Sequence, residues 1–270
     1  MQKTNKFTKL LKAIVAIVKT PSLLNLVLDD ANEWQKSCQK KYKTLAHLPI
    51  LPWETLIPQG LNIKTCFLDG GSMPTDIALL KALALRLGSQ ASYFEIGTWR
   101  GESVYNVAEV LEDCSTLNLS AAEMQTLGWS PKYAELHGIL SKKKANIKHL
   151  LGHSQSFDFA ALNKKYDLIF IDGDHSYAMV KHDTEEVFKH LKHENTIIVW
   201  HDYAFNPEKI RYEVLQGILD AIPSDKHQHL YHVENSMCAV YLPQKQACKA
   251  FESPCKPEHW FNVSISQEKI

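Results

Sequence analysis

The middle of the chain alternates short apolar runs with stretches in which apolar residues recur at helical spacing. The apolar, β-rich runs cover residues 91–96, 115–119, 146–151, 166–172 and 195–200. Helical patterns cover residues 74–87, 102–112, 121–141, 176–192 and 206–221. Because strands that alternate with helices form parallel sheets with helical crossovers, the pattern predicts an α/β fold with a Rossmann-like, doubly wound sheet.

Two further apolar runs end this pattern. Residues 229–233 and 238–242 are separated by a short segment that contains Glu234 and Asn235. Such a pair is typical of an antiparallel hairpin. We therefore expect one domain over residues 67–243, mostly parallel with a closing antiparallel hairpin strand, and a C-terminal tail over residues 244–270.

Residues 1–66 form an N-terminal extension that we expect to be helical and loop-like. Its apolar residues at helical spacing are Phe7, Leu10, Leu11, Ile14, Val15 and Val18, and its lysines lie mostly off this stripe at Lys3, Lys6, Lys12 and Lys19. The stripe is too short to cross a bilayer, and no signal-peptide cleavage site follows it. We expect a helix that packs on its own domain or on a partner subunit.

A basic amphipathic helix that lies on a membrane surface is the alternative for this stripe. Peripheral membrane contact therefore stays open, although it is not the favoured prediction. After about residue 34 the extension is expected to be loop-like up to residue 60, because Pro49, Pro52 and Pro58 punctuate it.

The strand at 91–96 leads into a glycine-containing turn and then a helix. Glu95 ends the strand, and Gly97 and Gly101 allow the backbone to turn tightly. Backbone N–H groups at a helix start favour a carboxylate or phosphate, and Glu95 can accept hydrogen bonds from an amine or a ribose. The turn alone is also compatible with an ordinary tight turn or another nucleotide site.

Polar clusters follow two later strands. Asp172, Asp174 and His175 come after the run at 166–172, and His201 with Asp202 comes after the run at 195–200. In a parallel sheet the carboxyl ends of the strands meet at one edge, where ligands bind. We therefore expect these side chains and Glu95 to converge on one crevice.

The three motifs together resemble the class I S-adenosylmethionine-dependent methyltransferases. The chain carries E-I-G-T-x-x-G-x-S, F-I-D-G-D-H-S-Y and H-D-Y, and it is most similar to the small-molecule and sugar O-methyltransferase-like branch, the methyltransferase domain family 24-like group. The resemblance covers roughly residues 67–243. It implies an enzyme that uses S-adenosylmethionine to methylate an oxygen of a small polar acceptor, such as a sugar or glycan precursor.

The resemblance also implies the cofactor-binding residues. Trp99 stands where the first motif often has its middle glycine, and Asn118 falls where the family usually places an acidic residue for the ribose hydroxyls. An amide can still bond a hydroxyl. The residues expected to bind the cofactor are Glu95, Gly97, Thr98, Gly101, Ser103, Asn118, Ser154, Asp172 and Gly173.

The expected catalytic residues are Asp172, His175, His201 and Asp202. In metal-dependent relatives, carboxylates after the fourth and fifth core strands hold a divalent metal ion, and Asp172, His201 and Asp202 match those positions. His201 replaces what is usually an acid. Two alternatives stay open, a divalent metal that lowers the pKa of the acceptor hydroxyl, or His201 as a general base without metal.

Composition limits the partners and the compartment. Thirty basic residues balance thirty acidic ones, so no overall field attracts nucleic acid. The six scattered cysteines and the missing secretory signal suggest reduced thiols and a cytoplasmic location. The sequence also allows the protein to form a homo-oligomer. The alternatives to a methyltransferase are a non-catalytic S-adenosylmethionine-binding or scaffolding protein, or a hydroxylase-like member of the same fold.

Overall fold

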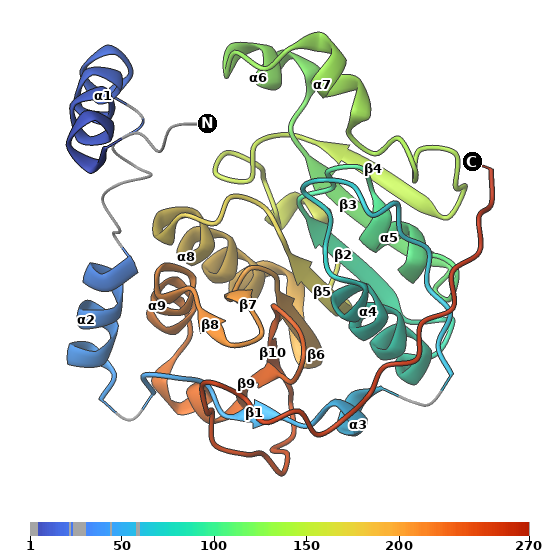
Figure 1. Cartoon of the computed structure of the whole chain (residues 1–270). Helices are drawn as coiled ribbons and strands as arrows, with labels where there is room; N and C mark the ends of the chain where they lie inside the picture. Colours follow the sequence, from blue (N-terminus) through green and yellow to red (C-terminus); the bar gives the residue numbers. More distant parts are fainter. Residues whose placement is uncertain (1–4, 22, 24–30, 44, 58–59, 270) are drawn as a thin grey trace.

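A sheet of eight strands crosses the protein, with helices on both faces (Figure 1). The structure is a computed structural model that describes residues 5–21, 23, 31–43, 45–57 and 60–269. The sheet order is β1–β9–β10–β6–β5–β2–β3–β4. The strands are β1 (Ile50–Leu51), β2 (Ser92–Ile96), β3 (Asp113–Asn118), β4 (Ile147–Leu151), β5 (Tyr166–Ile171), β6 (Lys192–Trp200), β9 (Leu230–Val233) and β10 (Ala239–Tyr241).

The connectivity of the sheet decides where a ligand can bind. The chain enters the core at β2 and runs outward to β3 and β4, then returns to β5 on the other side of β2. These pairs and β5–β6 are parallel, whereas β10 is antiparallel to both β6 and β9. The chain therefore adds strands first on one side of β2 and then, from β5 onward, on the other side. Such a switch point opens a crevice at the carboxyl ends of the strands. The predicted doubly wound sheet with a closing antiparallel hairpin is confirmed.

Side chains alternate between the two faces of each core strand. Tyr93 packs in a cluster with α4 and α5 residues, while the next residue, Phe94, packs in a cluster with α8 and α9 residues. Both faces are buried, which explains why these strands are apolar along their whole length. The helices of the domain are α4 (Pro74–Leu87), α5 (Glu102–Val107), α8 (Tyr177–Glu186, continued by a π-helical turn Val187–Leu191) and α9 (Tyr212–Ala221).

The connection between β3 and β4 forms a separate projection at the top of Figure 1. It contains α6 (Ala121–Thr126) and α7 (Pro131–Leu136). The expected single helical region over 121–141 is interrupted at Gly128, which has a φ of +79°. Short 3₁₀ helices occupy Ala160–Leu162 and Ser224–His229.

The extension contributes more to the fold than the sequence indicated. Residues 34–60 were expected to be loop-like, but α2 (Ala31–Lys41), β1 and α3 (Trp53–Leu56) form within and around them. The ring of Trp34 stacks on Tyr177 of α8 at 5.1 Å, and Lys41 bonds Asp220 of α9 at 2.8 Å. The loop prediction was wrong because α2 is stabilised by packing on α8 and α9, which a local pattern does not reveal.

Two other expectations about the described chain changed. The helix expected over 206–221 begins only at Tyr212, because β7 (Ala204–Asn206) and β8 (Lys209–Ile210) pair as a small hairpin before it. The N-terminal helix α1 (Lys6–Lys19) forms as expected, but none of its residues is fully buried and Ile17 is partly buried. No helix in the described ranges has the length and apolar character that a membrane span requires.

Candidate active site

The turn after β2 lies directly against the turn after β5. Gly97 has a φ of +95°, and a Cβ built on it would lie only 1.9 Å from the backbone oxygen of Asp172. A side chain at this position is therefore excluded. Trp99 also has a positive φ, +41°, so it keeps the left-handed conformation that suits the glycine often found there. The turn after β2 and the turn after β5 therefore place Thr98 and Asp172 at the same edge of the sheet.

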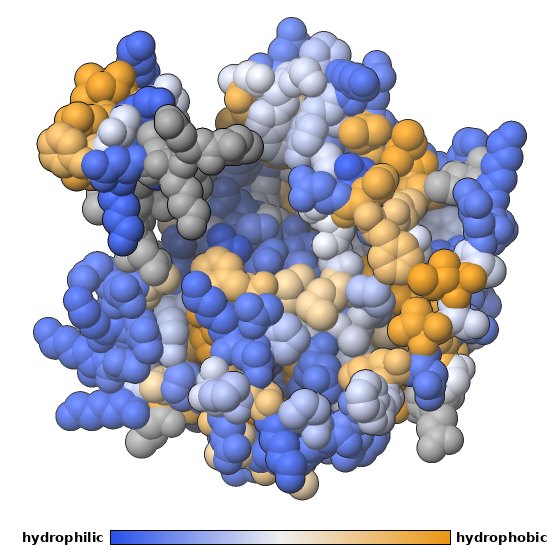
Figure 2. All heavy atoms as spheres, viewed as in Figure 1, coloured by the Kyte–Doolittle hydropathy of each residue, from blue (hydrophilic) through white to orange (hydrophobic). Residues whose placement is uncertain are grey.

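A cavity of about 1070 Å³ opens at this edge of the sheet. Figure 2 shows a hollow in the upper half of the molecule, with hydrophilic residues visible in it. The predicted site residues that line the cavity are Gly97, Thr98, Asn118, Ser154, Asp172, Gly173, His175, His201 and Asp202. Three predicted residues do not line it, namely Glu95, Gly101 and Ser103. Gly101 instead packs against Ser141, whose Oγ would lie 2.2 Å from a built Cβ.

Glu95 lies beneath the cavity and is fully buried. Its carboxylate accepts hydrogen bonds from the hydroxyl of Tyr93 at 2.7 Å and of Thr116 at 3.0 Å. Burial raises the pKa of Glu95 to about 8, since these bonds only partly offset the loss of hydration. Glu95 thus supports the floor of the cavity, and its direct contact with a ligand stays a prediction.

The two later strand-end clusters meet at His201. Its Nδ1 atom lies 3.1 Å from Asp172 Oδ1 and 3.0 Å from Asp202 Oδ2. His175 approaches the same carboxylate, with Nε2 3.1 Å from Asp202 Oδ2, and Arg211 lies 3.8 Å from the other oxygen of Asp202. Asp202 has a φ of +53°, which turns its carboxylate back toward His201. The predicted convergence of these residues is therefore present in the structure.

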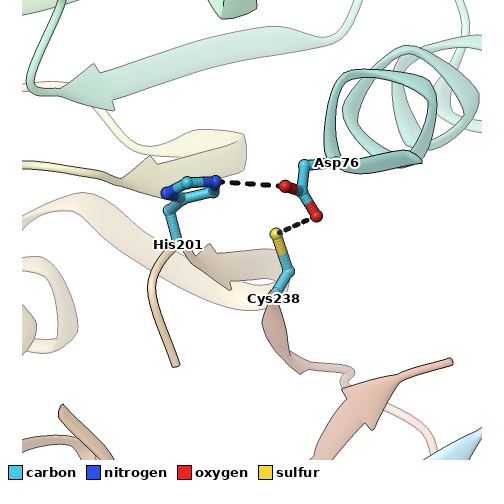
Figure 3. A group of neighbouring side chains, drawn as sticks. All are labelled: Asp76, His201 and Cys238. Atoms are coloured by element: carbon cyan, nitrogen blue, oxygen red, sulfur yellow. Dashed lines mark hydrogen bonds and ion pairs between the residues drawn. The ribbon is translucent and has the colours of Figure 1, made fainter. Parts of the chain in front are cut away.

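A third acid, Asp76, lies on the other side of the His201 ring (Figure 3). Nε2–H of His201 donates to Asp76 Oδ2 across 3.2 Å, and Asp76 is completely buried at the start of α4. The Asp76 carboxylate also accepts from the backbone N–H groups of Met73 and Met237, each at 2.9 Å, and from the Cys238 thiol at 3.6 Å. Sequence reasoning missed Asp76, because an acid in the first turn of a helix is ordinary capping chemistry.

Three carboxylates control the charge of His201. Burial alone would lower its pKa, but Asp172, Asp202 and Asp76 together raise the pKa well above the ordinary value. Burial likewise opposes ionisation of Asp202, yet the bond to His201 keeps the pKa of Asp202 below its usual range. The three carboxylates therefore favour the protonated imidazolium form of His201, in which neither ring nitrogen can accept a proton.

The same atoms form a set of ligands for a divalent metal ion. Nδ1 of His201 and one oxygen each of Asp172 and Asp202 all lie within 4.8 Å of one another. Asp76 accepts a hydrogen bond from Nε2–H of His201, so this nitrogen keeps its proton. When Nδ1 loses its proton, its lone pair points toward the carboxylates of Asp172 and Asp202. A carboxylate behind a histidine ligand is a common arrangement at metal sites. The residues present therefore fit a metal ion.

An aromatic cluster forms another wall of the cavity. Trp99, Trp129, Tyr133 and His137 contact one another, with ring centroids 4.7–5.7 Å apart. Nδ1 of His137 bonds the Asn118 side chain at 3.0–3.2 Å, while its buried Nε2 has no hydrogen-bond partner among the described residues. Sequence reasoning missed this wall, although the spacing of 129, 133 and 137 is that of one helix face.

Comparison with known proteins agrees with this architecture. Residues 94–203 match the family described as a methyltransferase domain. That segment contains the turn after β2 and both later clusters. No curated protein sequence matches the chain at a significant level.

Solved structures also resemble the chain at low identity. Cofactor-bound Rv0187 from MTB is 16% identical, with 85% of this chain and 97% of that chain covered and a TM-score of 0.45. A Klebsiella pneumoniae protein described as an O-methyltransferase is 21% identical, with 64% of this chain and 82% of that chain covered and a TM-score of 0.43. A Staphylococcus aureus protein described as a caffeoyl-CoA O-methyltransferase is 15% identical, with 84% of this chain and 99% of that chain covered and a TM-score of 0.43. Similarity at this level carries no information about the acceptor.

Proposed function

We propose that this chain, which carries a class I S-adenosylmethionine-dependent methyltransferase domain, transfers the methyl group to an oxygen of a small polar acceptor. The observation that carries the proposal is the meeting of Asp172, His201 and Asp202 beside the Gly97 turn, in one cavity. Methyl transfer from a sulfonium is a direct displacement, so the protein has to align donor and acceptor. An oxygen acceptor also has to lose its proton, and this cluster is suited to that task.

The cofactor is proposed to occupy the side of the cavity between the Gly97 turn and the aromatic wall. Backbone atoms approach closely at Gly97, and the Asn118 amide can bond ribose hydroxyls. The unpartnered Nε2 of His137 and the rings of Trp129 and Tyr133 offer a polar contact and a flat apolar surface for a purine. These groups support S-adenosylmethionine as the ligand.

A divalent metal ion is proposed to bind to Nδ1 of His201 and to the carboxylates of Asp172 and Asp202. Such an ion would lower the pKa of an acceptor hydroxyl bound to it. One imidazole with two carboxylates suits Mn²⁺, Fe²⁺, Co²⁺ or Zn²⁺ better than Mg²⁺. The metal is favoured over His201 as a general base, because the carboxylates keep the metal-free imidazole protonated.

The acceptor is proposed to be polar because of the residues beyond the reaction centre. Asp174, His175, Arg211 and Glu213 line the cavity on that side. Charged groups and imidazole can bond several hydroxyls at once, which fits a sugar or a glycan precursor. A large apolar acceptor would displace water from these groups without replacing its hydrogen bonds, which is costly in a cavity.

The test measures binding and turnover separately. Calorimetry should show that the purified protein binds S-adenosylhomocysteine and, independently, Mn²⁺. A labelled methyl group should then be transferred to a member of a panel of hydroxyl-bearing sugars, and chelation should stop the transfer. Asp202→Asn should lose Mn²⁺ binding but keep cofactor binding, whereas the exposed control Asp225→Asn should keep both. A protein that binds no S-adenosylhomocysteine would contradict the proposed function.

A further inference from the structure

The helix α1 presents an apolar face that nothing in the described chain covers. The side chains of the stripe are between 49% and 75% exposed and comprise Phe7, Leu10, Leu11, Ile14, Val15 and Val18. Figure 1 shows α1 apart from the sheet and its packed helices, and Figure 2 shows these residues as an orange patch at the upper left. An exposed apolar patch of this kind marks an interaction surface.

The charged residues of α1 are all basic. At 100° per residue, Lys9 and Lys12 lie opposite the apolar stripe and Lys6 and Lys19 flank it, and the helix contains no acidic residue. The chain has no aspartate or glutamate before Asp29, although it is neutral overall. The helix therefore combines a local positive charge with an apolar stripe.

We propose that α1 binds in the plane of an anionic phospholipid bilayer. The apolar stripe would enter the boundary between headgroups and acyl chains, and the four lysines would lie among the anionic headgroups. At 14 residues the helix is about 21 Å long, shorter than the roughly 30 Å hydrocarbon core, so it lies on the bilayer and does not cross it.

A second copy of the chain fits this surface less well. Pairing two α1 helices through their stripes would leave the lysines of both copies without partners of opposite charge, because the helix has no acidic residue. The helix is also only two heptads long, whereas roughly three to four heptads are needed to indicate a coiled coil. Anionic headgroups, by contrast, complement the lysines directly.

Co-sedimentation with vesicles tests the proposal on the full chain. Vesicles of phosphatidylcholine alone are compared with vesicles in which about a third of the lipid is phosphatidylserine. We expect binding to the anionic vesicles that is at least about ten-fold stronger, and that weakens as salt is raised. Leu11→Ser with Ile14→Ser should reduce binding by about ten-fold or more, because it removes apolar area from the stripe.

A charge variant and its control separate attraction to lipid from a general change in net charge. Lys9→Gln with Lys12→Gln should weaken binding to the anionic vesicles by about ten-fold or more. Lys132→Gln with Lys143→Gln removes the same charge from exposed positions outside α1 and should leave binding unchanged. Thermal unfolding and S-adenosylhomocysteine binding should be unchanged in the α1 variants, since α1 buries no residue.

Two results would overturn the proposal. The first is equal or absent binding to both kinds of vesicle. The second is a halving of the molar mass in light scattering when Leu11 and Ile14 are replaced by serine, which would identify a second copy as the occupant. Because cofactor binding is measured in the same samples, failure of this proposal is distinguishable from failure of the proposed methyl transfer.

Discussion

Asp76 and His201 form a buried pair that joins the start of α4 to the end of β6, with 3.2 Å between Oδ2 and Nε2. They are 125 positions apart in the chain. Two backbone N–H groups fix the Asp76 carboxylate, so Asp76 in turn fixes the orientation of the His201 ring. The side of His201 that faces the cavity is therefore oriented by Asp76, a residue that does not line the cavity.

Replacing Asp76 with asparagine should weaken metal binding more than cofactor binding. An amide no longer holds the Nε2–H of His201 as strongly, and loss of such a partner typically costs about 10–100-fold in metal affinity. We expect this loss in calorimetry with Mn²⁺, together with about 1–3 kcal/mol of stability. S-adenosylhomocysteine affinity should change little.

The control for Asp76 is Cys238→Ser, which touches the same carboxylate but not the histidine. This variant should keep Mn²⁺ affinity close to that of the unaltered protein. If Asp76→Asn and Cys238→Ser lose metal affinity equally, Asp76 has only a structural role.

Removal of the proposed metal ion should abolish methyl transfer. Replacing His201 with alanine or chelating the metal ion should each abolish turnover, because both remove the means of activating the acceptor hydroxyl. Added Mn²⁺ should restore activity after chelation but not in His201→Ala. Full activity in the presence of a strong chelator would show that the cluster works without metal.

Stability should depend on pH through Glu95. The folded protein keeps a proton on Glu95 up to about pH 8, whereas the unfolded chain loses it near the ordinary value of 4.5. Stability from this group is therefore complete below pH 4.5 and is lost as the pH rises toward 8, by up to about 1.4 kcal/mol per pH unit.

Glu95→Gln removes this titration and keeps a group of similar shape. Urea unfolding at about pH 5 and about pH 8 should show the free energy of unfolding of the variant rising relative to the unaltered protein as pH increases. The difference between the two proteins cancels the titration of groups that they share. Parallel pH profiles would mean that Glu95 is ionised in the folded protein.

The aromatic wall should contribute to cofactor affinity. Stacking of a base on an aromatic side chain is worth about 1–3 kcal/mol, so Tyr133→Leu should weaken S-adenosylhomocysteine binding by about ten-fold or more. Tyr133 is 41% exposed, which keeps the cost in stability small. Tyr105→Leu is the matched control, because that ring lies outside the cavity. Equal effects of the two substitutions would contradict the prediction.

The class of fold and the positions of the strand-end polar clusters can be predicted from the sequence alone. Apolar strands such as 91–96 and 166–172 are encoded by neighbouring residues, and strand direction then brings Asp172, His201 and Asp202 to one edge of the sheet. The helix over Pro74–Leu87 and the closing hairpin follow from local periodicity in the same way. The catalytic, cofactor and metal roles of these residues stay predictions.

The residues that lie behind and around these clusters are identified by the packing of separate elements. Asp76 meets His201 because α4 packs on the sheet, and Glu95 lies beneath the cavity because its strand is covered on both faces. The two residues of β1 join the sheet through pairing with β9, far away in the sequence. Such contacts depend on how separate elements pack, and no local pattern encodes them, whereas periodicity and strand ends are properties of neighbouring residues alone.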